Sequence, residues 1–297
     1  MDADAILDRR RLKRRLVFWR LTAALAVMAL IAVGIGKYYT RDSPHVARLS
    51  ITGFITEDIE RREAIDELLA QDEVRAVIVS INSPGGTTAG SEQIYHALRR
   101  VAAKKPLVAV IGTIGTSGGY IVAIAADHIV AMETSLTGSI GVLFQTAEFT
   151  GLMEKLGITP FSLKSSPLKG QPSPVETVTE EAREALRLLL ADSYEWFSEL
   201  VRNRRQFDAE ELKRAADGRV FSGRQAVKLR LIDDLGGERV ARRWLKDSHD
   251  VSMDLPTIDV RWGEKSGLLA RTLDTVGGKL FKNERLTLDG LLSVWQP

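Results

Sequence analysis

A serine flanked by glycines is the residue of this sequence best suited to nucleophilic chemistry. Ser117 stands in the string Gly-Thr-Ser-Gly-Gly at 115–119, between an apolar run of strand length and a small-residue helical segment. This placement predicts Ser117 at the N-terminus of a helix, where backbone N–H groups and the helix dipole stabilise negative charge. Glycines on both sides allow a substrate backbone to come close. By itself, such a pattern more often marks a serine that only caps a helix in a glycine turn.

A second glycine segment follows the buried strand predicted over 74–81. The string Asn-Ser-Pro-Gly-Gly at 82–86 is typical of a turn. Sites in open α/β sheets gather at the carboxyl ends of strands. The backbone N–H groups of Gly85 and Gly86 are therefore candidates to hold an oxyanion.

Two further segments carry weaker signals. Thr-Gly-Ser-Ile-Gly at 137–141 is a polar bend before a strand, and the loop 162–179 is stiffened by three prolines. That loop contains Lys164 and Lys169 among apolar and small residues. Most lysines are solvated surface charges, so neither one indicates chemistry alone.

Strands that alternate with helices would position these segments. Apolar runs predict strands over 46–51, 74–81, 107–111, 128–132 and 139–144. Amphipathic or small-residue patterns predict helices over 59–69, 87–104, 117–126 and 180–204. This alternation predicts an α/β fold with a mainly parallel sheet.

Composition sets wide limits on function. The chain has 297 residues, of which 44% are hydrophobic and 27% charged, as in ordinary folded proteins. A net charge of only +2 gives no overall field that would attract nucleic acid. The absence of cysteine excludes a thiol nucleophile, disulfides and a cysteine-based zinc site.

The N-terminal region predicts a membrane anchor. Residues 1–20 hold seven Lys/Arg against three Asp. The 23-residue segment 17–39, which overlaps the end of this basic region, is long enough to cross a bilayer core of about 30 Å as a helix. Positive segments are retained in the cytoplasm, so the rest of the chain is expected outside. A cleaved signal peptide is the alternative, since small residues at 32, 34 and 36 would permit cleavage.

The ordered set of motifs resembles the signal peptide peptidase A family. The strings are INSPGG at 81–86, GTSGGYIVA at 115–123, TGSIGV at 137–142, LKSSPLKGQPSP at 163–174 and ADGRVFSGRQAVKLRLIDDLGG at 216–237. The resemblance covers about residues 46–245. It implies the Clp protease/crotonase-like fold, a spiral of ββα units, in the short single-repeat form. It also implies a ring-like homo-oligomer with sites at subunit contacts.

The resemblance assigns roles by motif position. It places the nucleophile at Ser117, the general base at Lys169 and a serine that hydrogen-bonds the base at Ser139. Oxyanion donors would be the N–H of Gly118 and one N–H from the Gly85–Gly86 pair. Lysine can accept the serine proton only when it is neutral, which burial away from carboxylates favours. No Asp or Glu lies between Lys155 and Val175. No metal or cofactor is required.

These inferences divide the chain into five regions. They are a basic cytoplasmic segment (1–16), a transmembrane anchor (17–39), a tether (40–45), a serine protease domain (46–250) and a C-terminal extension (251–297). The expected protein is a single-pass inner-membrane endopeptidase with its catalytic domain on the outer face. Its expected substrates are cleaved signal peptides and other membrane-derived peptides, and nucleic acid is not an expected partner.

Three other interpretations remain open at this point. In an α/β-hydrolase, Ser117, Asp233 or Asp234, and His249 would follow the order of a triad, although His249 lies in a polar string typical of a surface turn. A non-catalytic, crotonase-like membrane scaffold would need neither Ser117 nor Lys169. A CoA-binding crotonase enzyme is weaker, because an exported domain would meet little CoA.

Overall fold

The computed structural model describes residues 18–25, 27–28, 43–262 and 292–294. The chain forms two compact units, Met1–Pro44 and His45–Pro297. In the first unit, residues 18–25 and 27–28 are helical. Most of the predicted anchor at 17–39, and all of the basic segment at 1–16, lie outside the described residues. Among the residues that are described, no helix has the length and apolar character needed to cross a membrane.

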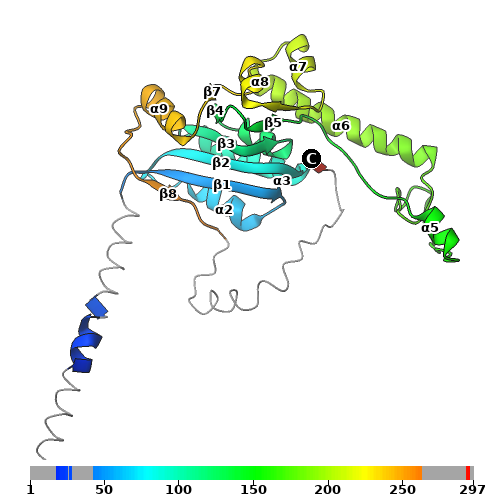
Figure 1. Cartoon of the computed structure of the whole chain (residues 1–297), viewed down its shortest axis with the longest axis horizontal. Helices are drawn as coiled ribbons and strands as arrows, with labels where there is room; N and C mark the ends of the chain where they lie inside the picture. Colours follow the sequence, from blue (N-terminus) through cyan, green and yellow to red (C-terminus); the bar gives the residue numbers. More distant parts are fainter. Residues whose placement is uncertain (1–17, 26, 29–42, 263–291, 295–297) are drawn as a thin grey trace, which may run out of the picture. The chain divides into compact units, whose positions relative to one another are not determined.

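A mixed sheet forms the centre of the second unit. Its strands are β1 (His45–Ile55), β2 (Val74–Thr87), β3 (Leu107–Thr116), β4 (His128–Ala131), β5 (Leu136–Gly138), β6 (Val220–Ser222), β7 (Asp234–Leu235), β8 (Thr257–Asp259) and β9 (Leu292–Val294). The main order is β6-β5-β3-β2-β1-β8, in which only β6 runs antiparallel to its neighbour (Figure 1). β4 pairs with the first half of β3, β7 pairs with β4, and β9 runs antiparallel to the end of β2.

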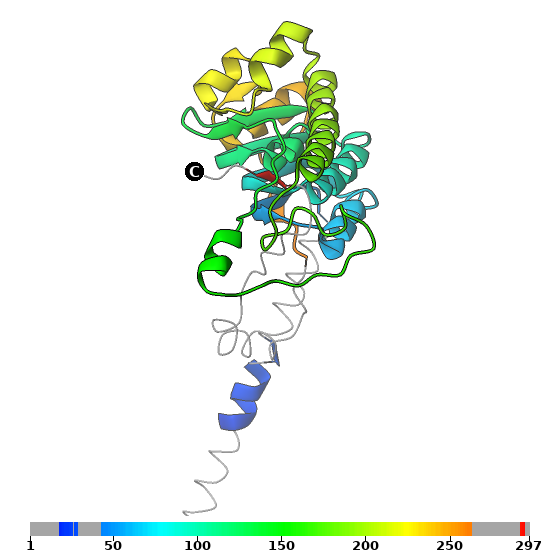
Figure 2. The same cartoon turned by 90° about the vertical axis from the view of Figure 1, so that its right-hand side faces the viewer.

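Helices cover both faces of this sheet, and the described part of the second unit holds eight of them. They are α2 (Ile59–Glu67), α3 (Thr88–Ala102), α4 (Gly118–Ala123), α5 (Thr150–Lys155), α6 (Glu180–Arg205), α7 (Ala209–Ala215), α8 (Gly223–Lys228) and α9 (Glu238–His249). Val77 and Val79 of β2 belong to the core beneath α3 and α4, whereas Ala76 and Ile78 belong to the core beneath α9. Side chains on a strand alternate between faces, so β2 is covered on both sides. Figures 1 and 2 show α3 and α9 beside the sheet, whereas α5 lies away from it.

A predicted turn is continuous strand, because β2 runs through the Asn-Ser-Pro-Gly-Gly string to Thr87. β3 is also longer than the strand predicted over 107–111 and ends at Thr116. For β2, the reason is tertiary pairing: Phe54 and Ile55 of β1 lie opposite Gly85 and Gly86. A Cβ on Gly86 would lie 1.9 Å from the Ile55 carbonyl oxygen, so glycine is required for this close approach. The strand predicted over 139–144 is also wrong. The nearest strand, β5, spans Leu136–Gly138 and ends before that range begins.

Candidate active site

Ser117 lies between the end of β3 and the first residue of α4. Its backbone has φ 53° and ψ −118°, a region that non-glycine residues rarely adopt, and the residue is 1% exposed. The Ser117 N–H donates to the Gly138 carbonyl (2.8 Å), and the N–H of Tyr120 donates to the Ser117 carbonyl (2.9 Å). Such strain, about 1–3 kcal/mol, persists only where surrounding contacts fix the backbone. The predicted position at a helix N-terminus is confirmed.

Close packing holds α4 against the sheet. A Cβ on Gly119 would lie 2.7 Å from the Ser83 carbonyl oxygen, so a side chain there would push α4 away from β2. Tyr120 is fully buried and its hydroxyl donates to the Leu231 carbonyl (2.7 Å). Burial raises the pKa of the Tyr120 hydroxyl, which keeps it a neutral donor.

The glycine end of β2 lies beside Ser117. The Thr116 hydroxyl donates to the Pro84 carbonyl (3.2 Å), which joins the residue before Ser117 to the residue before Gly85. The Gly85 N–H already donates to Ser83 Oγ (3.1 Å). The Gly85 N–H is thus engaged within β2, and an oxyanion donor from the Gly85–Gly86 pair stays a prediction.

Ser139 lies next to the nucleophile candidate. Gly138, which accepts the Ser117 N–H, is paired with Thr116 and immediately precedes Ser139. Ser139 also has a positive φ (51°), and its N–H donates to the Arg219 carbonyl (2.8 Å). The structure thus brings Ser117, Gly118, Ser139 and the Gly85–Gly86 pair together; their catalytic roles stay predictions.

Lys169 is placed differently from the other predicted residues. It belongs to a long excursion between β5 and α6, residues 143–179, which we call the arm. Lys169 is exposed, and its N–H donates to the Ser166 carbonyl (3.1 Å) within a turn. Within the described part of the chain, no hydrogen bond or ion pair joins Lys169 to Ser117. Figures 1 and 2 show α5, at the start of the arm, away from the sheet.

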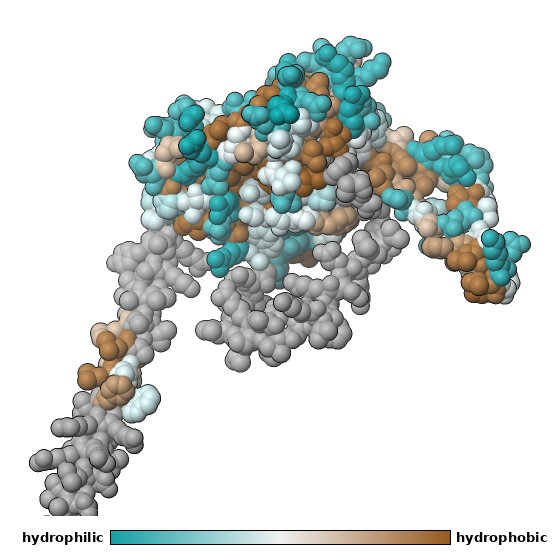
Figure 3. Space-filling model, in the orientation of Figure 1, coloured by the Kyte–Doolittle hydropathy of each residue, from teal (hydrophilic) through white to brown (hydrophobic). Residues whose placement is uncertain are grey.

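The arm exposes apolar side chains. None of the residues of α5 is buried. The exposed large hydrophobic residues of the arm are Phe149 (48%), Leu152 (55%), Leu156 (64%), Ile158 (51%), Phe161 (90%), Leu163 (92%) and Leu168 (39%). Figure 3 shows this apolar surface on the arm. Apolar groups gathered in this way are typical of a surface that contacts another molecule.

The two lysines of the arm have different surroundings. The Lys164 ammonium donates to the Glu176 carboxylate, which also accepts from Ser162 and from Gln171 Nε2 (2.6 Å). The hydrogen bond from Lys164, followed by that from Ser162, holds the pKa of Glu176 below its usual range. Glu176 directly follows the acid-free interval between Lys155 and Val175, so the sequence did not indicate its contact with Lys164.

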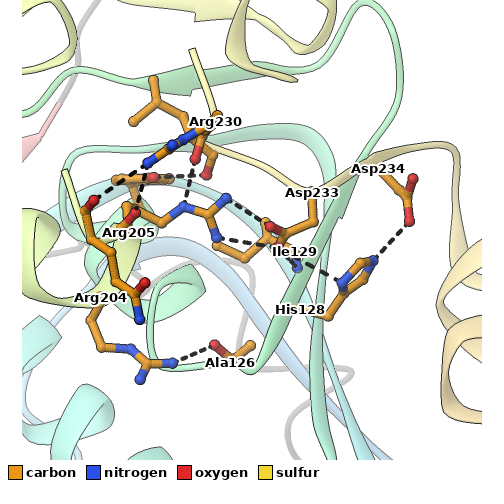
Figure 4. A network of polar contacts seen from close by, with 11 residues as sticks. Ala126, His128, Ile129, Arg204, Arg205, Arg230, Asp233 and Asp234 are labelled. Atoms are coloured by element: carbon orange, nitrogen blue, oxygen red, sulfur yellow. Dashed lines mark hydrogen bonds and ion pairs between the residues drawn. The ribbon is translucent and has the colours of Figure 1, made fainter. Parts of the chain in front are cut away.

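A polar network ties the end of α6 to the far end of α4. Arg204 donates to the carbonyls of Ile124 (2.8 Å) and Ala126 (2.8 Å), which follow α4. Arg205 pairs with Asp233 (2.7 Å), and Asp233 accepts the Ile129 N–H at the start of β4 (2.7 Å; Figure 4). The C-terminal end of α4, the helix that follows Ser117, is therefore fixed by hydrogen bonds from residues about 80 positions later in the chain. No local sequence signal indicated this contact.

The α/β-hydrolase triad is excluded by the sheet register. His128 lies opposite Val108 near the start of β3, whereas Ser117 follows its last residue, Thr116. Along β3, Val108 and Thr116 are eight residues apart, which places His128 about 26 Å from Ser117. His128 pairs with Asp234 (2.9 Å).

His249 lies at that same distant end of the sheet. The Trp244 ring stacks on His128 (4.7 Å between ring centroids) and contacts His249 (4.8 Å). The second candidate acid, Asp233, is paired with Arg205. Neither the histidine nor the aspartates of the proposed triad can act at Ser117.

The mixed α/β sheet fits a Clp protease-like fold, and the nucleophile candidate Ser117 lies in it where β3 meets α4. Residues 99–252, just over half of the chain, match the family model for peptidase family S49. The chain belongs to this family, which is that of signal peptide peptidase A, and it is a serine peptidase. The matched region includes Ser117, Ser139 and Lys169.

Individual relatives agree with this assignment. A Synechocystis protein with a provisional protease name is 36% identical over 212 residues, which are 71% of this chain and 76% of that protein. An Enterococcus faecium protein provisionally named signal peptide peptidase SppA is 35% identical over 55% of this chain and 48% of its own length. Protease 4 of Salmonella typhi is 32% identical over 62% of this chain and 31% of its own length. The chain thus spans less than half of the last two relatives.

Proposed function

We propose that this chain is an endopeptidase in which Ser117 attacks the peptide carbonyl and Lys169 of a neighbouring copy removes the serine proton. One observation carries this proposal. Ser117 is buried among glycine backbone at the sheet, whereas Lys169 lies on an exposed arm that its own chain does not join to Ser117 by any hydrogen bond or ion pair of the described residues.

The residues around Ser117 support acyl transfer. Attack by Ser117 Oγ on the carbonyl would form a tetrahedral intermediate, whose oxyanion the N–H groups of Gly118 and Gly86 could hold. Collapse of this intermediate expels the amine with the proton that Lys169 received, and water then hydrolyses the acyl-enzyme. Ser139, next to Ser117, would orient the lysine amine.

The apolar arm supports a contact between copies. Burial of its exposed leucines and phenylalanines against a neighbour would remove them from water and would surround Lys169 with apolar atoms. Such surroundings disfavour the charged form of lysine, as a general base requires. Lys164, paired with Glu176, is the less suitable base.

Mixing two inactive variants tests the shared site. We expect Ser117→Ala and Lys169→Ala chains, each inactive alone, to recover about a quarter of wild-type peptide hydrolysis when refolded together in equal amounts, because random assembly of a symmetric ring pairs an intact serine with an intact lysine at that frequency. Failure to recover activity in mixed oligomers would place both residues in one chain. Mixing Ser117→Ala with itself is the control.

We further propose that the chain is anchored in the cytoplasmic membrane by residues 17–39, with the peptidase outside. The basic residues before this segment support that orientation. A reporter fused after Pro297 is expected to be active only when it functions outside the cytoplasm. Activity only in the cytoplasm, or a mature chain that begins after Gly36, would contradict the anchored topology.

The proposed substrates are signal peptides and other membrane-derived peptides. An extended peptide can add to a sheet edge through backbone hydrogen bonds, which makes few sequence demands. We expect the enzyme to cleave a released signal peptide after leucine or small apolar residues and to leave a folded globular protein intact. Mass spectrometry of both digests is the measurement. Rapid digestion of the folded protein with an untouched signal peptide would overturn this substrate class.

A further inference from the structure

A segment from near the C-terminal end of the sequence lies on the glycine end of β2. Residues Leu292–Val294 form β9, which runs antiparallel to β2 in the register Gly85↔Val294, Gly86↔Ser293 and Thr87↔Leu292. The same glycine pair is the predicted source of an oxyanion donor. β9 therefore lies at the candidate active site.

The pairing of β2 shows on which side β9 lies. β1 occupies one edge of β2 as far as Gly86, through the pairs Phe54↔Gly85 and Ile55↔Gly86. β3 occupies the other edge only to the pair Ser83↔Gly115, and the chain then turns into Ser117 and α4. Because a strand has two edges, β9 fills the length that β3 leaves. β9 is also in contact with α4.

An extended substrate would need this same length of edge. It is the part of β2 that lies beside Ser117, and a peptide bound there would pair with the backbone of Gly85–Thr87. We infer that the segment Leu292–Val294 occupies the peptide-binding groove of its own chain and competes with substrates for it. This inference rests on the proposed function, and the apolar residues Leu292 and Val294 match the apolar substrates proposed above.

Introduced cysteines test the occupancy, because the natural sequence contains none. In the full chain with Ser117→Ala, the pair Thr87→Cys and Leu292→Cys joins residues that lie opposite each other. We expect this pair to form an intramolecular disulfide on mild oxidation. The matched control, Thr87→Cys with Val294→Cys, is displaced by two strand residues, about 7 Å, too far for a disulfide.

The disulfide also tests competition without any chemistry at Ser117. Binding of a fluorescent leucine-rich peptide to the oxidised Thr87→Cys/Leu292→Cys chain is expected to weaken at least about tenfold and to recover on reduction, as it must when a ligand and a tethered segment exclude each other. Equal crosslinking of the control pair, crosslinks between chains, or unchanged peptide affinity would each overturn the inference. If the peptide binds but the wild-type chain cannot hydrolyse it, the proposed function fails and this inference stands.

A proline provides an independent test in the active enzyme. Ser293→Pro removes a backbone N–H and fixes φ, which disfavours an antiparallel strand. We expect KM for a short peptide to fall roughly three- to tenfold with kcat unchanged, as if the segment filled two thirds to nine tenths of the grooves. Ser293→Ala keeps the backbone and should leave KM unchanged. An unchanged KM in Ser293→Pro would contradict self-occupancy.

Discussion

Replacing Ser117 by alanine is expected to lower kcat/KM for peptide hydrolysis by about 10⁴-fold or more, the loss typical when a serine nucleophile is removed. The fold should survive. The Ser117 side chain makes no capping hydrogen bond to α4, and alanine demands the same backbone conformation at φ 53°. The measurements are kcat/KM and the midpoint of thermal unfolding.

Another buried serine provides a matched control for this variant. Ser198 on α6 is 7% exposed, and its hydroxyl has no hydrogen-bond partner among the residues that the structure describes. Ser198→Ala should therefore keep full activity. If Ser117→Ala retains substantial hydrolysis, the nucleophile lies elsewhere in the chain.

Replacing Lys169 by alanine is expected to lower kcat by about 10³-fold or more, because the serine then has no neighbour to remove its proton. Lys169→Arg should be as inactive, since arginine remains protonated and cannot serve as a base. A lysine that only supplied positive charge would be replaced by arginine with much of the activity kept. Peptide hydrolysis by the three purified proteins is the comparison.

Lys164 is the control for Lys169, because both belong to the arm. Lys164→Ala removes the ion-pair partner of Glu176 and should lower kcat only a few-fold, because the proton transfer is assigned to Lys169 and not to Lys164. A larger loss in Lys164→Ala than in Lys169→Ala would show that the wrong lysine was assigned. His249→Ala should be fully active.

Sequence patterns predicted the centre of the fold because they depend on local chemistry. The apolar runs of β1, β2 and β3 and the serine before α4 lie where periodicity and glycine signals indicate. The end of β2 was mispredicted as a turn, since Pro84, Gly85 and Gly86 are turn residues by propensity. Pairing with β1 overrides that propensity.

The supporting residues of the site depend on contacts between distant segments. Arg204 binds carbonyls that follow α4, and Arg205 binds Asp233, with no repeated spacing or motif to indicate either pair. The position of Lys169 also could not be predicted. Prolines and a glycine predict that this segment is a loop outside the sheet. The position of Lys169 depends on contacts that the loop makes with other parts of the protein, and the local sequence does not encode these contacts.

Helix α6 links the two separated halves of the proposed machinery. It spans Glu180–Arg205, and 26 helical residues form a rod about 39 Å long. Its first residue follows the arm. At its other end, Arg204 donates hydrogen bonds to the carbonyls of Ile124 and Ala126, which follow α4. One helix thus contacts, at its two ends, the arm that carries Lys169 and the chain segment that follows α4. A length of about 39 Å separates these two regions within one chain, which suits an arm that reaches toward a neighbouring copy.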